Sequence, residues 1–78
     1  MTNQQEEKIL DIMIQVEELA GEVIEYRGGR NQMGEDTVHA IASFADHDAA
    51  CNAFDSGLEL GTGFAYVETH TIIIQAVA

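Results

Sequence analysis

The first third of the chain has the apolar spacing of one long amphipathic helix. At ~100° per residue its apolar side chains form one broad stripe, made of Ile9, Ile12, Val16, Leu19, Ala20 and Val23, with Met13 and Ile24 on its flank. Thr2 or Asn3 can cap the start of this helix, and Gly28 can end it. Gly21 interrupts the stripe at a cost of up to ~1 kcal/mol relative to alanine, but the stripe resumes in phase beyond it. We therefore expect a single helix over residues 4–27.

The opposite side of this expected helix carries a row of carboxylates. They fall within an arc of about 60° and are Glu7, Asp11, Glu18, Glu22 and Glu25. Leu10 and Ile14 lie at the edge between this row and the apolar stripe. We predict that the row and the apolar pair bind a partner protein, because charge sets the rate of encounter while a few apolar residues supply most interface energy. A solvated helix face and ordinary packing at the edge of the core are the alternatives.

The charge balance of the chain narrows the class of partner. The 78 residues carry a net charge of −11, with fourteen acids against Lys8, Arg27 and Arg30. This balance disfavours direct binding to nucleic acid or to an anionic membrane and favours a basic protein surface. Acidity that serves only solubility is the simpler alternative.

Size and composition predict one folded domain. A chain this short buries only about 60–65% of its unfolded surface, yet its hydrophobic content of 46% is that of a globular protein. The single cysteine, Cys51, excludes an internal disulfide framework. We find no secretion signal and no run of the ~18 apolar residues that span a bilayer, so a cytoplasmic location is expected, in the host cell if the chain is encoded by a phage.

The remainder of the chain has the pattern of an α+β fold. After the first helix we expect a loop at 28–36, a strand at 37–45, a helix at 46–57, and strands at 63–68 and 71–77. Asp46 can cap the start of the second helix and Gly57 can close its end. The last two strands form either a hairpin or one long bent strand.

The run Ile72-Ile73-Ile74 predicts the order of the three strands. It lacks polar alternation, which is typical of a central strand that is buried on both faces. We therefore expect a β-α-β-β unit with sheet order first, third, second, mainly antiparallel, and the long helix packed across one face. A cover for the second face would need the 46–57 helix, the loop, or another copy of the protein.

The sequence contains no catalytic or cofactor motif. Cys51 with a histidine partner would also need an oriented third group and a pocket that excludes water, so we predict that the protein is not an enzyme. His47 and Cys51 at i, i+4, with His39 and His70 on strands, are the possible metal ligands, but no paired ligand motif anchors them. We expect no metal and no cofactor.

In this character the chain resembles the small acidic inhibitor proteins of bacteriophages and mobile elements, which include anti-CRISPR proteins and DNA-mimic inhibitors. The resemblance rests on the short single domain, the charge balance and the carboxylate row, and these proteins share no common fold. It implies a non-enzymatic inhibitor that occupies the basic nucleic-acid-binding groove of a target protein. Five carboxylates over ~27 Å of helix are sparser than the phosphates of a DNA strand, one per ~3.4 Å. Other acids would have to extend the field: Glu35, Asp36, Asp46, Asp48, Asp55 and Glu59.

Two other functions remain open on the sequence alone. One is a small homodimeric structural or adaptor protein that associates through its isoleucine-rich sheet or the edge of that sheet. The other is a metal-binding regulator that uses the histidines and Cys51.

Overall fold

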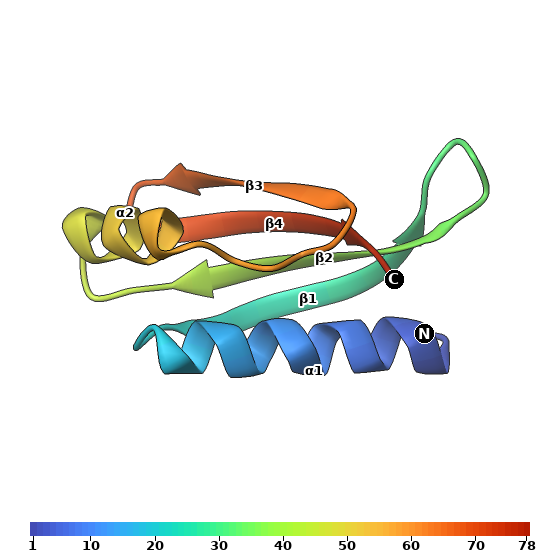
Figure 1. Cartoon of the computed structure of the whole chain (residues 1–78), viewed down its shortest axis with the longest axis horizontal. Coiled ribbons are helices and arrows are strands. Elements are labelled where there is room, and N and C mark those ends of the chain that lie inside the picture. Colours follow the sequence, from blue (N-terminus) through green and yellow to red (C-terminus); the bar gives the residue numbers. More distant parts are fainter.

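The computed structural model describes all 78 residues and consists of two helices and one four-stranded antiparallel sheet. In chain order the elements are α1 (Asn3–Glu18), β1 (Glu22–Arg30), β2 (Asp36–Ser43), α2 (His47–Ser56), β3 (Gly63–Glu68) and β4 (Thr71–Val77). The order of strands in the sheet is β1-β2-β4-β3. Figure 1 shows α1 running along the sheet and the turn between β1 and β2 projecting from one end of the molecule.

The α+β class and the arrangement of the last three strands are confirmed. β4 lies between β2 and β3 and is antiparallel to both, and β3 and β4 form a hairpin. The caps of α2 are also as predicted. The Asp46 carboxylate accepts a hydrogen bond of 2.8 Å from the Ala49 N–H, and Gly57 ends the helix with a φ of 89°.

The predicted length of the first helix is wrong. α1 ends at Glu18, and the residues that were expected to continue it to Arg27 form strand β1, so the sheet has four strands and not three. Ala20 takes a left-handed φ of 66°, and Gly21 lies against the ring of Phe44, where an added Cβ would come within 2.6 Å of Cζ. The helix is closed at this point because Ala20 N–H donates to the Glu17 carbonyl oxygen at 3.0 Å and Gly21 N–H donates to that of Val16 at 2.9 Å.

The predicted loop over residues 28–36 is correspondingly shorter in the structure. β1 continues to Arg30 and β2 begins at Asp36, which leaves a tight turn between them. The Asn31 side-chain oxygen accepts hydrogen bonds of 3.0 Å from the N–H groups of Met33 and Glu35 and so closes the turn. Backbone pairing along the full length of β2 satisfies donors and acceptors that the expected loop would have left to solvent.

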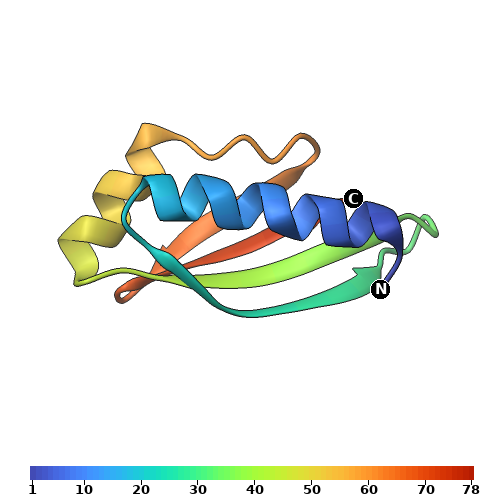
Figure 2. The same ribbon diagram turned by 90° about the horizontal axis from the view of Figure 1, so that it is seen from below.

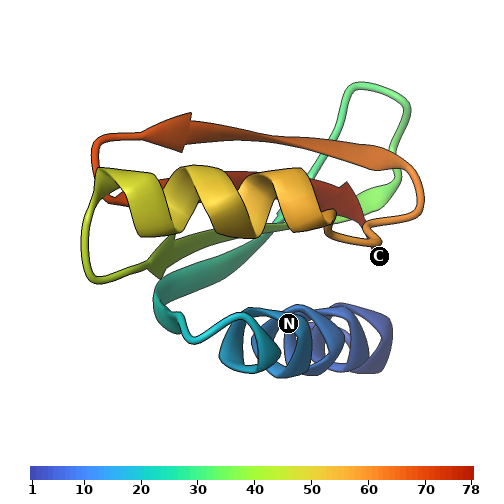
Figure 3. The same cartoon turned by 60° about the vertical axis from the view of Figure 1, so that its left-hand side comes forward.

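Both helices cover the same face of the sheet. α1 packs on β1 and β2, and α2 packs on β3 and β4; Figure 2 shows α1 lying across the sheet, and Figure 3 shows α2 in front of β4. The core between the layers consists of Ile9, Ile12, Val16, Val38, Ala40, Ala42, Phe44, Ala50, Ala53, Leu60, Ile72, Ile74 and Ala76. We call this covered side the inner face of the sheet and the other side the open face.

Two expected positions in the core are corrected by this packing. Ile73 points to the open face and is only half-buried, so β4 is central in the sheet but is not buried on both faces. Helical spacing puts Phe54, four residues after Ala50, on the side of α2 that the sequence predicts to be buried, but it is 40% exposed, and the smaller Ala53 packs in the core instead. The space between α2 and the sheet accommodates alanine rather than a ring.

The start of α1 is anchored by Gln5. Thr2 caps the helix: its hydroxyl accepts from the Gln5 N–H at 3.1 Å, while the Gln5 side-chain oxygen accepts from the Thr2 N–H at 2.8 Å. The same amide donates from Nε2 to the carbonyl oxygens of Gly29 and Thr37, both at 3.0 Å. One buried side chain thus ties α1 to β1 and β2.

Neither α1 nor α2 is both long enough and apolar enough to cross a membrane.

Candidate protein-binding site

The outward side of α1 presents carboxylates beside an exposed apolar pair. Glu7, Asp11 and Glu18 are exposed, and Leu10 and Ile14 have exposed fractions of 58% and 57%. The inward direction of the helix is set by its buried residues: Gln5, Ile9, Ile12 and Val16. At ~100° per residue Ile14 then points almost directly away from the core, with Leu10 one turn before it. The pair is therefore exposed and lies along one side of the three carboxylates, next to Glu7.

Glu22 and Glu25 do not belong to this surface. They lie on β1, where Glu22 pairs with Ser43 and Glu25 pairs with Ile41. Directly paired residues share a face of the sheet, and both partners point to the open face. The single row of five carboxylates is therefore divided, with three on α1 and two on the far side of the sheet. We define the α1 outer face as Glu7, Leu10, Asp11, Ile14 and Glu18.

No arginine or lysine neutralises the carboxylates of the α1 outer face. The only ion pair in the structure joins Arg30 Nε to Asp36 Oδ1 at 3.5 Å, in the β1–β2 hairpin. The nearest cation on the helix, Lys8, is half-buried and forms no ion pair. The negative charge of this face is thus available to a partner.

Glu59 joins the α1 outer face through a contact that the sequence did not predict. Gln15 donates from Nε2 to Asp11 Oδ2 at 3.0 Å and to the Glu59 carbonyl oxygen at 2.9 Å, and its Oε1 accepts from the Glu59 N–H at 2.7 Å. These bonds hold the segment before β3 beside the helix and place a further exposed glutamate near Asp11. The bond from Gln15 to Asp11 joins residues four positions apart, so the sequence holds a local signal for it. The two bonds between Gln15 and Glu59 span 44 residues and have no local signal.

The other acids considered from the sequence serve local roles or lie on other elements. Asp36 pairs with Arg30, Asp46 caps α2, and Glu35 accepts from the Asn31 amide at 3.1 Å. Asp48 and Asp55 are exposed on α2. Of the six acids that could have extended the row, only Glu59 is hydrogen-bonded to α1.

The open face of the sheet is the second surface with exposed side chains that no other element covers. The strand registers arrange its side chains in rows across the four strands. One row is Arg27, His39, Gln75 and Phe64; the next is Glu25, Ile41, Ile73 and Tyr66; the last is Glu22, Ser43, Thr71 and Glu68. Phe64 and Tyr66 are 57% and 49% exposed, and no helix lies over them.

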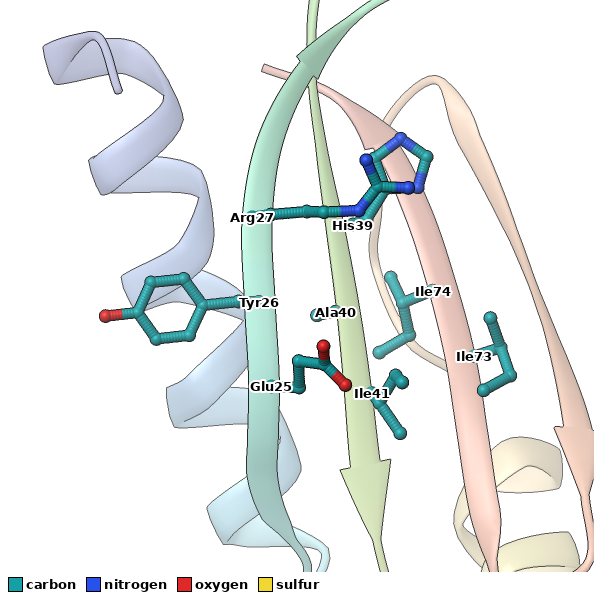
Figure 4. Close-up of a pocket in the computed structure, with 8 residues that line it drawn as sticks. All are labelled: Glu25, Tyr26, Arg27, His39, Ala40, Ile41, Ile73 and Ile74. Carbon is teal, nitrogen blue, oxygen red and sulfur yellow. The ribbon is translucent and has the colours of Figure 1, made fainter.

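A hollow of about 150 Å³ lies on this face beside β1. Figure 4 shows Glu25, Arg27, Ile41 and Ile73 around it, with the Arg27 guanidinium beside the His39 ring, while Tyr26 points the other way toward α1. Burial, and to a lesser extent the positive charge of Arg27, lowers the pKa of His39 from its ordinary value of 6.5. The imidazole is therefore neutral at pH 7.

The possible nucleophile and metal ligands come together only in part. Cys51 Sγ lies 3.4 Å from His47 Nε2, and His47 Nδ1 donates to the Thr69 carbonyl oxygen at 2.6 Å. This carbonyl is an oriented third group, but neither Cys51 nor His47 lines any of five hollows on the surface of the molecule. No group of three or more His, Cys, Asp or Glu side chains is arranged to hold a metal ion.

Comparisons with protein-family models, with curated proteins and with solved structures each found no match to this chain. The geometry of its own surfaces therefore carries the functional argument.

Proposed function

We propose that the protein is a non-enzymatic inhibitor that docks the α1 outer face into the basic nucleic-acid-binding groove of a target protein. One observation carries the proposal: carboxylates without an ion-pair partner lie beside two exposed apolar side chains on a single helix. The resemblance to phage and mobile-element inhibitors, of anti-CRISPR or DNA-mimic type, supports the class of target and rests on overall character alone.

The charge of this face suits a groove that normally holds phosphates. Glu7, Asp11 and Glu18 project from one side of a helix that is ~24 Å long, and Glu59, held to Gln15 through its backbone, is a further exposed acid at the side of this helix. Lysines and arginines that bind a nucleic acid would attract this field, which steers the encounter and weakens as salt is added. Glu22 and Glu25 contribute to the net charge but lie on the open face, so we assign them no contact in this complex.

Leu10 and Ile14 supply the apolar contacts that would hold the complex together once charge has brought the partners into contact. A helix that lies in a groove is typically anchored by apolar residues at i and i+4, and this pair has that spacing on the outward side. Burial of such a side chain contributes about 1.5–3 kcal/mol, whereas exposed ion pairs contribute about 1 kcal/mol or less. The proposed complex is therefore steered by carboxylates and held by the apolar pair, and it differs from an imitation of a full DNA strand.

The test begins with capture of a nucleic-acid-binding protein from host lysate and then measures displacement of nucleic acid from it. We expect the triple variant Glu7→Lys, Asp11→Lys, Glu18→Lys to bind the captured protein about 100-fold more weakly or worse. The matched control, Glu35→Lys, Asp48→Lys, Asp55→Lys, changes the net charge equally on other surfaces and should retain most of the binding. Equal loss in both variants, or binding that does not weaken with added salt, would contradict the proposal.

A second variant separates the apolar anchors from the charges. Leu10→Ser with Ile14→Ser leaves the net charge unchanged, so it should keep the rate of association and raise the rate of dissociation. Circular dichroism should show the same helical content as in the unmodified protein, since both side chains are more than half exposed. Unchanged dissociation would show that the pair has no part in the contact.

A further inference from the structure

We infer that the open face of the sheet is a second interface and that its partner is another copy of this chain. The inference is independent of the proposed function, because it concerns the opposite side of the molecule and a different type of interaction. It starts from the middle of the face, where Ile41 and Ile73 are directly paired and half-buried. Phe64 and Tyr66 extend this apolar surface across β3.

The open face carries a group of four apolar and aromatic side chains at and beside its centre, and no helix covers them. Antiparallel sheets with one solvated face normally alternate apolar and polar residues, so that the solvated face is polar. Here the centre of β4 departs from this alternation. Ile73, which faces outward between the buried Ile72 and Ile74, is apolar like its two neighbours. Exposed apolar surface of this kind, with polar residues at its rim, marks an interaction site.

The distribution of charge identifies a second copy as the partner. Of the fourteen acids, the registers place only Glu22, Glu25 and Glu68 on the open face, all on the outer strands. Arg27 lies on the same face, so its charge is mixed and small, whereas the α1 outer face is strongly acidic. A strongly basic partner would therefore be drawn to α1, and two copies can join their open faces while their acidic helices point away from each other.

The rows of the open face are complementary to themselves. Two sheets packed face to face lie ~10 Å apart with strands ~30° from alignment. A two-fold axis along the strands, between β2 and β4, brings β1 over the partner's β3. Ile41 then lies opposite the partner's Ile73, and Arg27 lies opposite the partner's Phe64, which gives an apolar centre and a cation over an aromatic ring. The like-charged pair, Glu22 opposite the partner's Glu68, falls at the end of the strands, where solvent screens it.

The size of the face sets the strength of the dimer. Four strands of about six residues cover roughly 19 by 20 Å, or about 400 Å² before side-chain relief is included. A standard stable interface buries ~800 Å² on each partner, so the dimer should be weak and in exchange with monomer. Two molecules of net charge −11 also repel each other, and added salt should therefore strengthen this association or leave it unchanged.

Sedimentation of the purified protein over a range of concentrations is the experiment. We expect a reversible dimer that persists at high salt and is weakened about tenfold or more by Tyr66→Asp. The matched control Ile14→Asp adds the same charge at a residue of similar exposure on α1, and it should leave the dimer intact. Phe64→Ala, which adds no charge, is the second variant and should also weaken the dimer.

Three results would overturn the inference. The first is a wild-type protein that stays monomeric up to about 1 mM. The second is a dimer that both Tyr66→Asp and Phe64→Ala leave intact, which would indicate pairing through a strand edge or through α1. The third is a dimer that Ile14→Asp disrupts as strongly as Tyr66→Asp. Since Ile14→Asp tests the inhibitor contact and Tyr66→Asp tests the dimer, failure of one proposal leaves the other measurable.

Discussion

Three consecutive isoleucines in β4 have different surroundings. Ile72 and Ile74 are fully buried on the inner face, under two helices, whereas Ile73 between them faces outward and is only half-buried. The residue type is the same and the backbone is continuous, so the difference comes entirely from what lies over each face of the sheet. The inner face holds the fold together, and the open face has apolar surface left for a partner.

The largest effect is expected when the same substitution, isoleucine to alanine, is made on the inner face and on the open face. Ile74→Ala should reduce the free energy of unfolding by about 2–5 kcal/mol, because it leaves a cavity among closely packed side chains. Ile73→Ala should reduce it by about 1 kcal/mol or less in the monomer, because its surroundings can be filled by solvent. Urea denaturation at a low protein concentration measures both values. Equal losses would mean that the open face is as fully packed as the inner one.

A smaller effect is expected where the chain passes from α1 to β1 at the edge of the inner face. Gly21→Ala places a methyl group against the buried ring of Phe44 and should cost about 1–3 kcal/mol. Gly34→Ala in the β1–β2 turn meets no neighbouring atom but must keep a φ of 80°, so it should cost about 1 kcal/mol. Thermal unfolding of the two variants separates crowding from backbone strain. A stabilised Gly21→Ala variant would show that residues 19–23 can continue the helix.

The smallest effect concerns the open face and pH. The pKa of His39 is lowered by burial and by Arg27, so the unfolded chain takes up a proton at a higher pH than the folded one. Stability from this group is therefore complete above its ordinary pKa of 6.5 and is lost as pH falls below that value toward the folded pKa. His39→Gln should flatten this part of the stability profile, and His70→Gln, at an exposed turn, is the matched control. Identical profiles for both variants would assign the slope to other groups.

The second half of the fold was predictable because its signals are local and agree with one another. The alternation of β2, the caps Asp46 and Gly57, and the isoleucine run of β4 each indicate the same elements that the structure contains. The buried stripe of α1, formed by Ile9, Ile12 and Val16, was predicted for the same reason. Even the position of β4 between β2 and β3 followed from its composition.

The candidate site was only partly predictable. The exposure of Leu10 and Ile14 and the outward position of Glu7, Asp11 and Glu18 follow from helical spacing, which acts within one element. The assignment of Glu22 and Glu25 to the same row failed because it depended on the helix reaching Arg27. Glu59 was placed beside the row by hydrogen bonds from Gln15 across 44 residues, which no local pattern reveals.

The sequence by itself determined the acidic balance, the inward side of the first four turns of α1, and the caps of α2, since these depend on composition and on neighbours a few residues apart. Only the tertiary structure decided that residues 22–30 form a strand. Val23 points toward the core in a helix that continues in phase and also in the observed strand, so periodicity could not distinguish the two. Pairing with β2 supplied the backbone hydrogen bonds that selected the strand, and that choice separated the acids into two surfaces.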